Sequence, residues 1–176
     1  PICIFGVFQN KLNDVFLHYF DHKISFRTDS DFVVNNLTGL YTLEYSIESG
    51  SGGGISDPQF AQEMEQLTSW LSEQEYIRYV ASYTDVLKKL NMNFHEDDGN
   101  MFKIPDARAL IAQLILMYEL SLPYGLDLSN QINIDKSATR LSIAIDTISS
   151  SEVRDLDQRI RNWINENTYR ISTKGA

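Results

Sequence analysis

Two segments of this chain follow the same order of strand, helix and strand, and this repeat constrains the fold more than any other feature. Residues 40–47 and residues 139–147 alternate between apolar and polar side chains, as a strand with one buried face does. Each is followed by a helical pattern and then by a second short strand, expected at residues 76–81 and around Tyr169 and Ile171. Two β-α-β units of this size pair most simply as a split β-α-β sandwich, in which two helices cover one face of a four-stranded sheet. The sequence therefore predicts an α+β, ferredoxin-like fold.

The two helical patterns carry matching signals at their starts and along their apolar sides. Asp57 and Pro58 suit the cap and first turn of the first helix, and Ser149 and Glu152 form a capping-box pattern before the second. The apolar positions recur at helical spacing, and they are Phe60, Met64, Leu67 and Leu71, then Val153, Leu156, Ile160, Trp163 and Ile164. The best internal match aligns Leu67-x-x-Trp70-Leu71-x-Glu73-x-x-Tyr76 with Ile160-x-x-Trp163-Ile164-x-Glu166-x-x-Tyr169. Coincidence between two amphipathic helices is the alternative to a true repeat, so the fold prediction depends mainly on element order.

The rest of the chain lies before and between these two units in the sequence. We expect an N-terminal helical segment adjoining a membrane helix at residues 1–37 and a first β-α-β unit at 38–82. A helical insertion between the second and third strands follows at 83–134, and a second β-α-β unit at 135–176. Residues 1–8 are almost entirely apolar, and they could form a core strand or the end of a membrane helix. Helical spacing then continues to about Phe20.

The insertion contains two expected helices, and the second has an unusual surface. The first covers residues 84–93, with Asp85 near its N-terminus. Pro105 opens the second, which is apolar around nearly its whole circumference over residues 109–120. Such a helix is either buried within the domain or meets an apolar ligand, a lipid or a neighbouring subunit. The candidate contact residues are Leu110, Leu114, Met117 and Tyr118.

The composition excludes several classes of protein. The net charge is −9, from 15 basic and 24 acidic side chains. The chain therefore lacks the excess of basic side chains that binding to a nucleic acid requires, and a nucleic-acid partner is not expected. The single cysteine, Cys3, excludes an internal disulfide and a cysteine-based metal cluster.

No constellation of residues points to catalysis. The chain lacks a Gly-x-Ser-x-Gly elbow, a Gly-Lys-Ser/Thr phosphate loop and a His-Glu-x-x-His motif. Asp29 and Asp31, with His18, could serve a soluble enzyme, but a helix cap before Phe32 explains the two carboxylates more simply. His18 and His22 have the spacing of zinc ligands, but without a third ligand surface histidines are favoured. We therefore expect no catalytic residue, no metal and no cofactor.

Three further patterns could each form a binding site, but each also has a purely structural interpretation. The glycine tract at residues 50–54 lies between a strand and a helix, where phosphates bind, but a flexible loop is favoured. The acidic residues 96–99 lack the register of a calcium loop and are expected to form a solvated turn. Lys136 and Arg140 could hold an anionic headgroup, or they could pair with Asp135 and the surrounding acid, which is the default for this net charge.

Several tracts between about Asn13 and Asn167 stand together in an order typical of one family. They are Asn13-Asp14-x-Phe16-x-x-Tyr19-Phe20-Asp21, Phe26-Arg27-x-Asp29-x-Asp31-Phe32, Asn36-Leu37-Thr38-Gly39, Gly54-Ile55-Ser56-Asp57-Pro58, Asp85-Val86-Leu87-Lys88-Lys89-Leu90-Asn91, Tyr118-Glu119-Leu120-Ser121-Leu122-Pro123-Tyr124-Gly125-Leu126-Asp127-Leu128 and Ile132-Asn133-Ile134-Asp135-Lys136-Ser137-Ala138-Thr139-Arg140. Together they resemble a bacterial RND-superfamily exporter of the MMPL-type, hydrophobe/amphiphile-efflux branch. Phe94-His95-Glu96-Asp97-Asp98 departs from the Met-His-Gly-Asp-Asp pattern expected there.

The resemblance implies an extracytoplasmic loop, more similar to the second such loop than to the first, built on a porter subdomain of β-α-β-β-α-β type. It implies proton-driven export of lipids, drugs or similar hydrophobic and amphiphilic molecules at the periplasmic face of the bacterial inner membrane. The implied partners are the substrate, the other periplasmic loop, the membrane helices of the same exporter and, as a further candidate, other copies in a homo-oligomer. The proton-coupling residues would lie in those membrane helices. A freestanding periplasmic module that binds a lipid or small ligand is the alternative.

Overall fold

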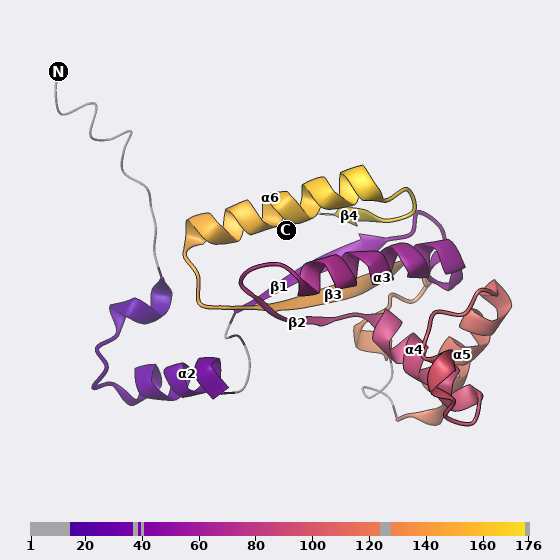
Figure 1. Cartoon of the computed structure of the whole chain (residues 1–176), viewed down its shortest axis with the longest axis horizontal. Coiled ribbons are helices and arrows are strands. Elements are labelled where there is room, and N and C mark those ends of the chain that lie inside the picture. The colour runs from indigo at the N-terminus through magenta and orange to yellow at the C-terminus, as the bar shows by residue number, and fades with distance from the viewer. Residues whose placement is uncertain (1–14, 37–38, 40, 124–127, 175–176) are drawn as a thin grey trace, which may run out of the picture.

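The chain folds into a mixed arrangement of helices around one antiparallel sheet (Figure 1). The computed structural model describes residues 15–36, 39, 41–123 and 128–174. The elements in these residues are η1 (Phe16–Tyr19), α2 (Ser25–Asn36), β1 (Tyr41–Glu48), η2 (Gly54–Ser56), α3 (Pro58–Ser72), β2 (Ile77–Ala81), α4 (Tyr83–Phe94), η3 (Gly99–Met101), α5 (Arg108–Ser121), η4 (Leu128–Asn130), β3 (Ala138–Ile145), α6 (Ser150–Asn167) and β4 (Ser172–Lys174), where η marks a short 3-10 helix. The α+β class expected from the sequence is therefore observed.

The sheet has four strands in the order β2-β3-β1-β4, and every neighbouring pair is antiparallel. The central pair runs from Tyr41 opposite Ile145 to Glu48 opposite Ala138. One face is covered by α3 and α6, and its side chains are buried; they include Tyr45, Ile47, Leu141, Ile143 and Ile145. The other face carries exposed polar side chains from β1, namely Thr42, Glu44 and Ser46. The alternation predicted for these two strands is confirmed.

Local capping signals start the two covering helices where the sequence predicted. The carboxylate of Asp57 accepts a hydrogen bond from the amide of Gln59, with Pro58 in the first turn of α3. Ser149 and Glu152 form the reciprocal capping box of α6. The recurring tryptophans of the two helices meet, since the rings of Trp70 and Trp163 stack with centroids 5.2 Å apart at 20°. The two aligned tryptophans therefore form a direct contact between α3 and α6.

The insertion folds as the helix pair α4 and α5, but α5 begins later than predicted. Its first residue is Arg108 rather than Pro105, and Ala107 before it is extended. Ile104 and Pro105 are buried, so packing holds the chain extended past the proline although proline suits a first helical turn. Only one side of this helix faces the core, and the opposite side is exposed, so burial within the domain does not account for its full apolar circumference.

Two other predictions about local structure are wrong. Tyr169 does not belong to the last strand but is 96% exposed in the turn before β4. The Glu63 carboxylate accepts hydrogen bonds from the amides of Tyr169 and Arg170, which holds this turn against α3. Asp29 and Asp31 do not cap a helix before Phe32, since both lie inside α2.

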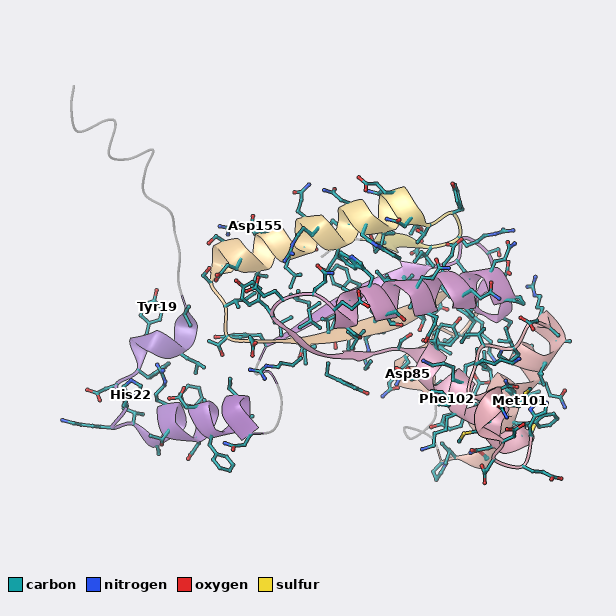
Figure 2. The ribbon with its side chains drawn as sticks, viewed as in Figure 1. Tyr19, His22, Asp85, Met101, Phe102 and Asp155 are labelled. Carbon is teal, nitrogen blue, oxygen red and sulfur yellow. The ribbon has the colours of Figure 1, made fainter. Side chains whose placement is uncertain are left out.

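The N-terminal segment, η1 with α2, lies apart from the sheet and its helices, and Figure 2 shows Tyr19 and His22 on this separate part. Arg27 joins its two elements, because one guanidinium nitrogen donates to the carbonyl of Leu17 at 2.8 Å while Nε contacts both oxygens of Asp31. The helix expected before Phe20 is only a 3-10 turn over the described part. The rest of that prediction, the apolar residues 1–8 and the expected first strand residue Leu40 lie outside the described residues.

Candidate functional site

The side of α5 that faces away from the core is apolar and exposed. Ile111, Leu114 and Ile115 are buried on the inner side. Leu116 is 50% exposed, Met117 49% and Leu120 79% on the outer side. Ala109 and Ala112 are also exposed, and their spacing from Leu116 and Leu120 continues one helical stripe. This outer stripe consists of Ala109, Ala112, Leu116, Met117 and Leu120; Gln113 lies within it, and the exposed Arg108 and Ser121 adjoin its ends.

The four contact residues predicted on this helix differ in how far they are buried. Leu114 is only 2% exposed and belongs to the core, so it cannot touch a ligand in this conformation. Leu110 and Tyr118 are half-buried and pack against the core at the border of the stripe. Only Met117 lies within the outer stripe. Leu116 and Leu120 were missed, because a helix that is apolar all round gives no signal about which side is buried.

Lys136 connects this helix to the turn before β3. Its Nζ lies 2.7 Å from Oε2 of Glu119, and both side chains are about one-third exposed or less. The cation therefore pairs with an acidic residue of α5 rather than with Asp135, whose Oδ2 accepts a hydrogen bond from Ser137 Oγ instead. The pairing fastens α5 to the second β-α-β unit.

The glycine tract is fastened by the same turn. Gly53 has a φ of 68°, a backbone conformation that glycine adopts without strain. Its amide donates to the carbonyl of Asp135, and the amide of Ile55 donates to the carbonyl of Lys136. A guanidinium nitrogen of Arg108 contacts the carbonyl of Gly53 at 3.2 Å. These two amides are thus engaged within the fold and not turned toward a phosphate.

Arg140 lies beside a cavity of about 390 Å³ on the sheet face that α3 and α6 leave open. The outer wall is residues 129–133, which run along β3 because Ile132 bridges to Thr139 and the carbonyl of Gln131 accepts from the amide of Arg140 at 2.7 Å. The nearest acidic group is Glu44 on β1, whose Oε1 lies 3.5 Å from the guanidinium. Sequence reasoning singled out Arg140 but missed its neighbours, since they come from distant segments.

A second polar cluster surrounds Lys88 on α4. Its Nζ lies 2.7 Å from Glu65 of α3, 3.1 Å from Asp85 and 5.3 Å from the centre of the Phe102 ring. Figure 2 labels Asp85 and Phe102 in this part of the molecule. Burial lowers the pKa of Lys88, but the hydrogen bonds and charges of Glu65 and Asp85 outweigh this effect and raise the pKa above its ordinary value. The cluster links α3 to α4, and its lysine stays charged.

The remaining candidate residues from the sequence do not come together in one catalytic or metal site within the described part of the chain. Asp31 forms an ion pair with Arg27, and Nδ1 of His22 lies 3.8 Å from Oδ2 of Asp31. Asp29 is exposed on another side of α2. The side chain of His18 lies outside the described part of the chain. Within the described ranges, no group of three histidine, cysteine or acidic side chains is placed to hold a metal ion. The turn at residues 96–99 is exposed.

Comparison of the chain with family models, with curated proteins and with solved structures finds no match. The structure therefore defines this protein by its architecture. It is an α+β domain with a four-stranded antiparallel sheet and a helical insertion between β2 and β3. No helix of the described residues has both the length and the apolar character needed to span a bilayer.

Proposed function

We propose that this chain is an extracytoplasmic porter domain of a proton-driven RND-type exporter of hydrophobic or amphiphilic molecules. The observation that carries the proposal is the outer stripe of α5, an exposed apolar surface in a chain of net charge −9. The family resemblance of the sequence tracts supports the same reading. In this proposal the domain lies at the periplasmic face of the bacterial inner membrane, as the second of two such loops.

The element order supports the finer fold assignment within this proposal. A split β-α-β sandwich places its third strand between the first and second strands, with all neighbours antiparallel. The order β2-β3-β1-β4 and the contact between Trp70 and Trp163 agree with a ferredoxin-like porter subdomain. The insertion then projects its apolar stripe from one end of that sandwich.

The proposed mechanism is binding without catalysis. The stripe offers apolar side chains to the apolar part of a substrate, or to the other periplasmic loop through which the substrate passes. Lys136 and Glu119 hold the stripe in place relative to the sheet. Proton coupling would be supplied by membrane helices of the same exporter.

The test uses the intact exporter with paired glutamate substitutions, Met117→Glu and Leu120→Glu. We expect export to fall about tenfold or more, because two apolar contacts are replaced by charges. Folding should survive, since both side chains are about half exposed or more. Gln62→Glu, an exposed change on α3, is the matched control and should export normally.

Full export by the folded double variant would refute the assignment. Leu114→Asp is unsuitable for this purpose, because a charge at a position 2% exposed would unfold the domain. A second measurement is independent of folding: the gene should encode apolar helices of about 20 residues on both sides of this chain.

The cavity beside Arg140 favours a second candidate, a freestanding periplasmic module that binds a lipid or small ligand. Such a module needs no membrane helices and no partner loop. The flanking sequence separates the two functions, since only the exporter requires membrane helices on both sides.

A further inference from the structure

We propose that the cavity beside Arg140 is a binding site for a neutral polyhydroxyl group, such as a sugar or a sugar headgroup. This inference does not rest on the proposed export function. The cavity measures about 390 Å³, which falls within the roughly 300–1,000 Å³ typical of small-ligand sites. It is lined by β1, the start of β3 and residues 129–133.

Arg140 retains hydrogen-bonding capacity that Arg27 and Arg161 use within the fold. Arg27 and Arg161 each bind both oxygens of an aspartate, at 2.8–2.9 Å and 2.9–3.1 Å. The guanidinium of Arg140 instead lies 3.5 Å from one oxygen of Glu44, beyond the usual hydrogen-bond length of about 2.7–3.2 Å. Its planar donors are therefore available to a ligand in the cavity.

Neutral polar groups complete the lining. Asn130, Gln131 and Ser46 all line the cavity, and none of the three side chains carries a charge. The two amides each provide donors and an acceptor, and the hydroxyl provides one donor and acceptor capacity. Ile132 of the outer wall and Ala138 at the start of β3 add a small apolar surface to the lining.

The charge balance selects the kind of ligand. Arg140 and Glu44 sum to zero, so neither an anion nor a cation is attracted without also meeting a like charge. A phosphate would accept from Arg140 but would face the Glu44 carboxylate, and an ammonium group would face the guanidinium. A hydroxyl group both donates and accepts, and adjacent hydroxyls can satisfy Glu44 and Arg140 together.

The experiment is an amide-resolved NMR titration of the purified 176-residue chain with glucose, galactose, maltose, sucrose and inorganic phosphate. At least one sugar should shift signals around Glu44, Gln131 and Arg140 in a saturable way. Arg140→Gln and Glu44→Gln should each weaken its binding about tenfold or more, because each removes a charge-assisted hydrogen bond. Arg154→Gln, an exposed change on α6, is the matched control and should leave the binding unchanged.

Three outcomes would overturn the inference. The first is that none of the sugars shifts these signals. The second is that phosphate binds there and Glu44→Gln tightens it, which would define an anion site. The third is sugar binding that persists at full strength in Arg140→Gln, with the fold checked by thermal unfolding. When a sugar does bind, a comparison of maltose with dodecyl maltoside below its micelle concentration distinguishes a free sugar from a lipid headgroup. A site for a lipid headgroup binds dodecyl maltoside more tightly than maltose, whereas a site for a free sugar does not.

Discussion

Two buried tyrosines carry hydroxyl groups that the fold requires in the protonated state. Tyr45 donates to Asp157 Oδ1 at 2.8 Å, which fastens β1 to α6. Tyr83 donates to the carbonyl of Ile55 at 3.0 Å, which fastens α4 to η2. Burial raises the pKa of both, with the hydrogen bond to Asp157 adding to it at Tyr45 and the charge of Asp57 adding to it at Tyr83.

These tyrosines predict a loss of stability at alkaline pH. Their folded-state pKa values lie above the ordinary 10.0, so the folded chain holds protons that the unfolded chain has released. Their contribution is complete below a pH of about 10 and is lost as the pH rises further. Urea unfolding from neutral to alkaline pH should show this decline in the wild type and a shallower decline in Tyr45→Phe and Tyr83→Phe.

The same variants have a cost at neutral pH. Each removes one hydrogen bond and should lower the free energy of unfolding by about 1 kcal/mol. Tyr169→Phe is the control, because Tyr169 is 96% exposed and should change neither the stability nor its pH dependence. An equally steep alkaline decline in both phenylalanine variants would contradict the assignment.

Lys88 and its neighbour Lys89 provide a second comparison at single residues. The Lys88 side chain is 13% exposed and contacts two carboxylates, whereas Lys89 is exposed. Lys88→Met should lower the free energy of unfolding by about 1–2 kcal/mol, less than for a fully buried pair, because it leaves Glu65 partly buried without its cation. Lys89→Met should change it by less than about 0.5 kcal/mol. Chemical denaturation of both variants tests the difference, and equal effects would show that the cluster contributes nothing.

At the scale of elements, one aromatic pair forms a direct contact between α3 and α6. Trp70 and Trp163 are the two tryptophans of the chain, and their stacked rings are half-buried between the helices. Aromatic pairs of this kind contribute about 0.5–1.5 kcal/mol beyond the area that they bury. The pair therefore provides both an energetic link and a spectroscopic probe of the packing between these helices.

A double-mutant cycle of Trp70→Leu and Trp163→Leu, in which each substitution removes one aromatic ring, measures this link. The coupling free energy should be about 0.5–1.5 kcal/mol, with each single variant less stable than the wild type. Circular dichroism should show an exciton signal from the stacked indoles in the wild type that disappears in either single variant. A wild type without this signal, or additive losses in the cycle, would contradict the stacking.

At the scale of the whole molecule, the N-terminal segment is separate from the rest. The hydrogen bonds and ion pairs of Arg27, Asp31 and Asn36 all stay within residues 15–36. Several apolar side chains of this segment are exposed, including Tyr19 at 67% and Phe32 at 62%. The hydrophobic core consists of residues from Tyr45 onward.

Removal of residues 1–38 should therefore leave the stability of the remaining domain almost unchanged. A free-energy change within about 0.5 kcal/mol corresponds to a shift of the melting temperature of about 1–2 °C. Calorimetry of the full chain and the shortened chain makes the comparison. A much larger decrease would show that the segment packs on the domain.

Much of the fold was predictable because its signals are local. A cap such as Asp57 or Ser149 acts over a few residues, and the alternation in β1 and β3 depends only on which face is buried. The failures arose where a distant residue decided the outcome. Glu63 holds Tyr169 in a turn, and the burial of Ile104 and Pro105 delays the start of α5.

The sequence by itself determined the order of strands and helices, the capped starts of α3 and α6, and the faces on which their apolar side chains lie. Only the tertiary structure decided which side of α5 is exposed, because a helix that is apolar all round has no preferred buried side until neighbours cover one. It also decided that Arg140 lies beside Glu44 and that Lys88 joins Glu65. Those residues are far apart along the chain, and nothing local couples them; strand pairing and helix packing bring them together.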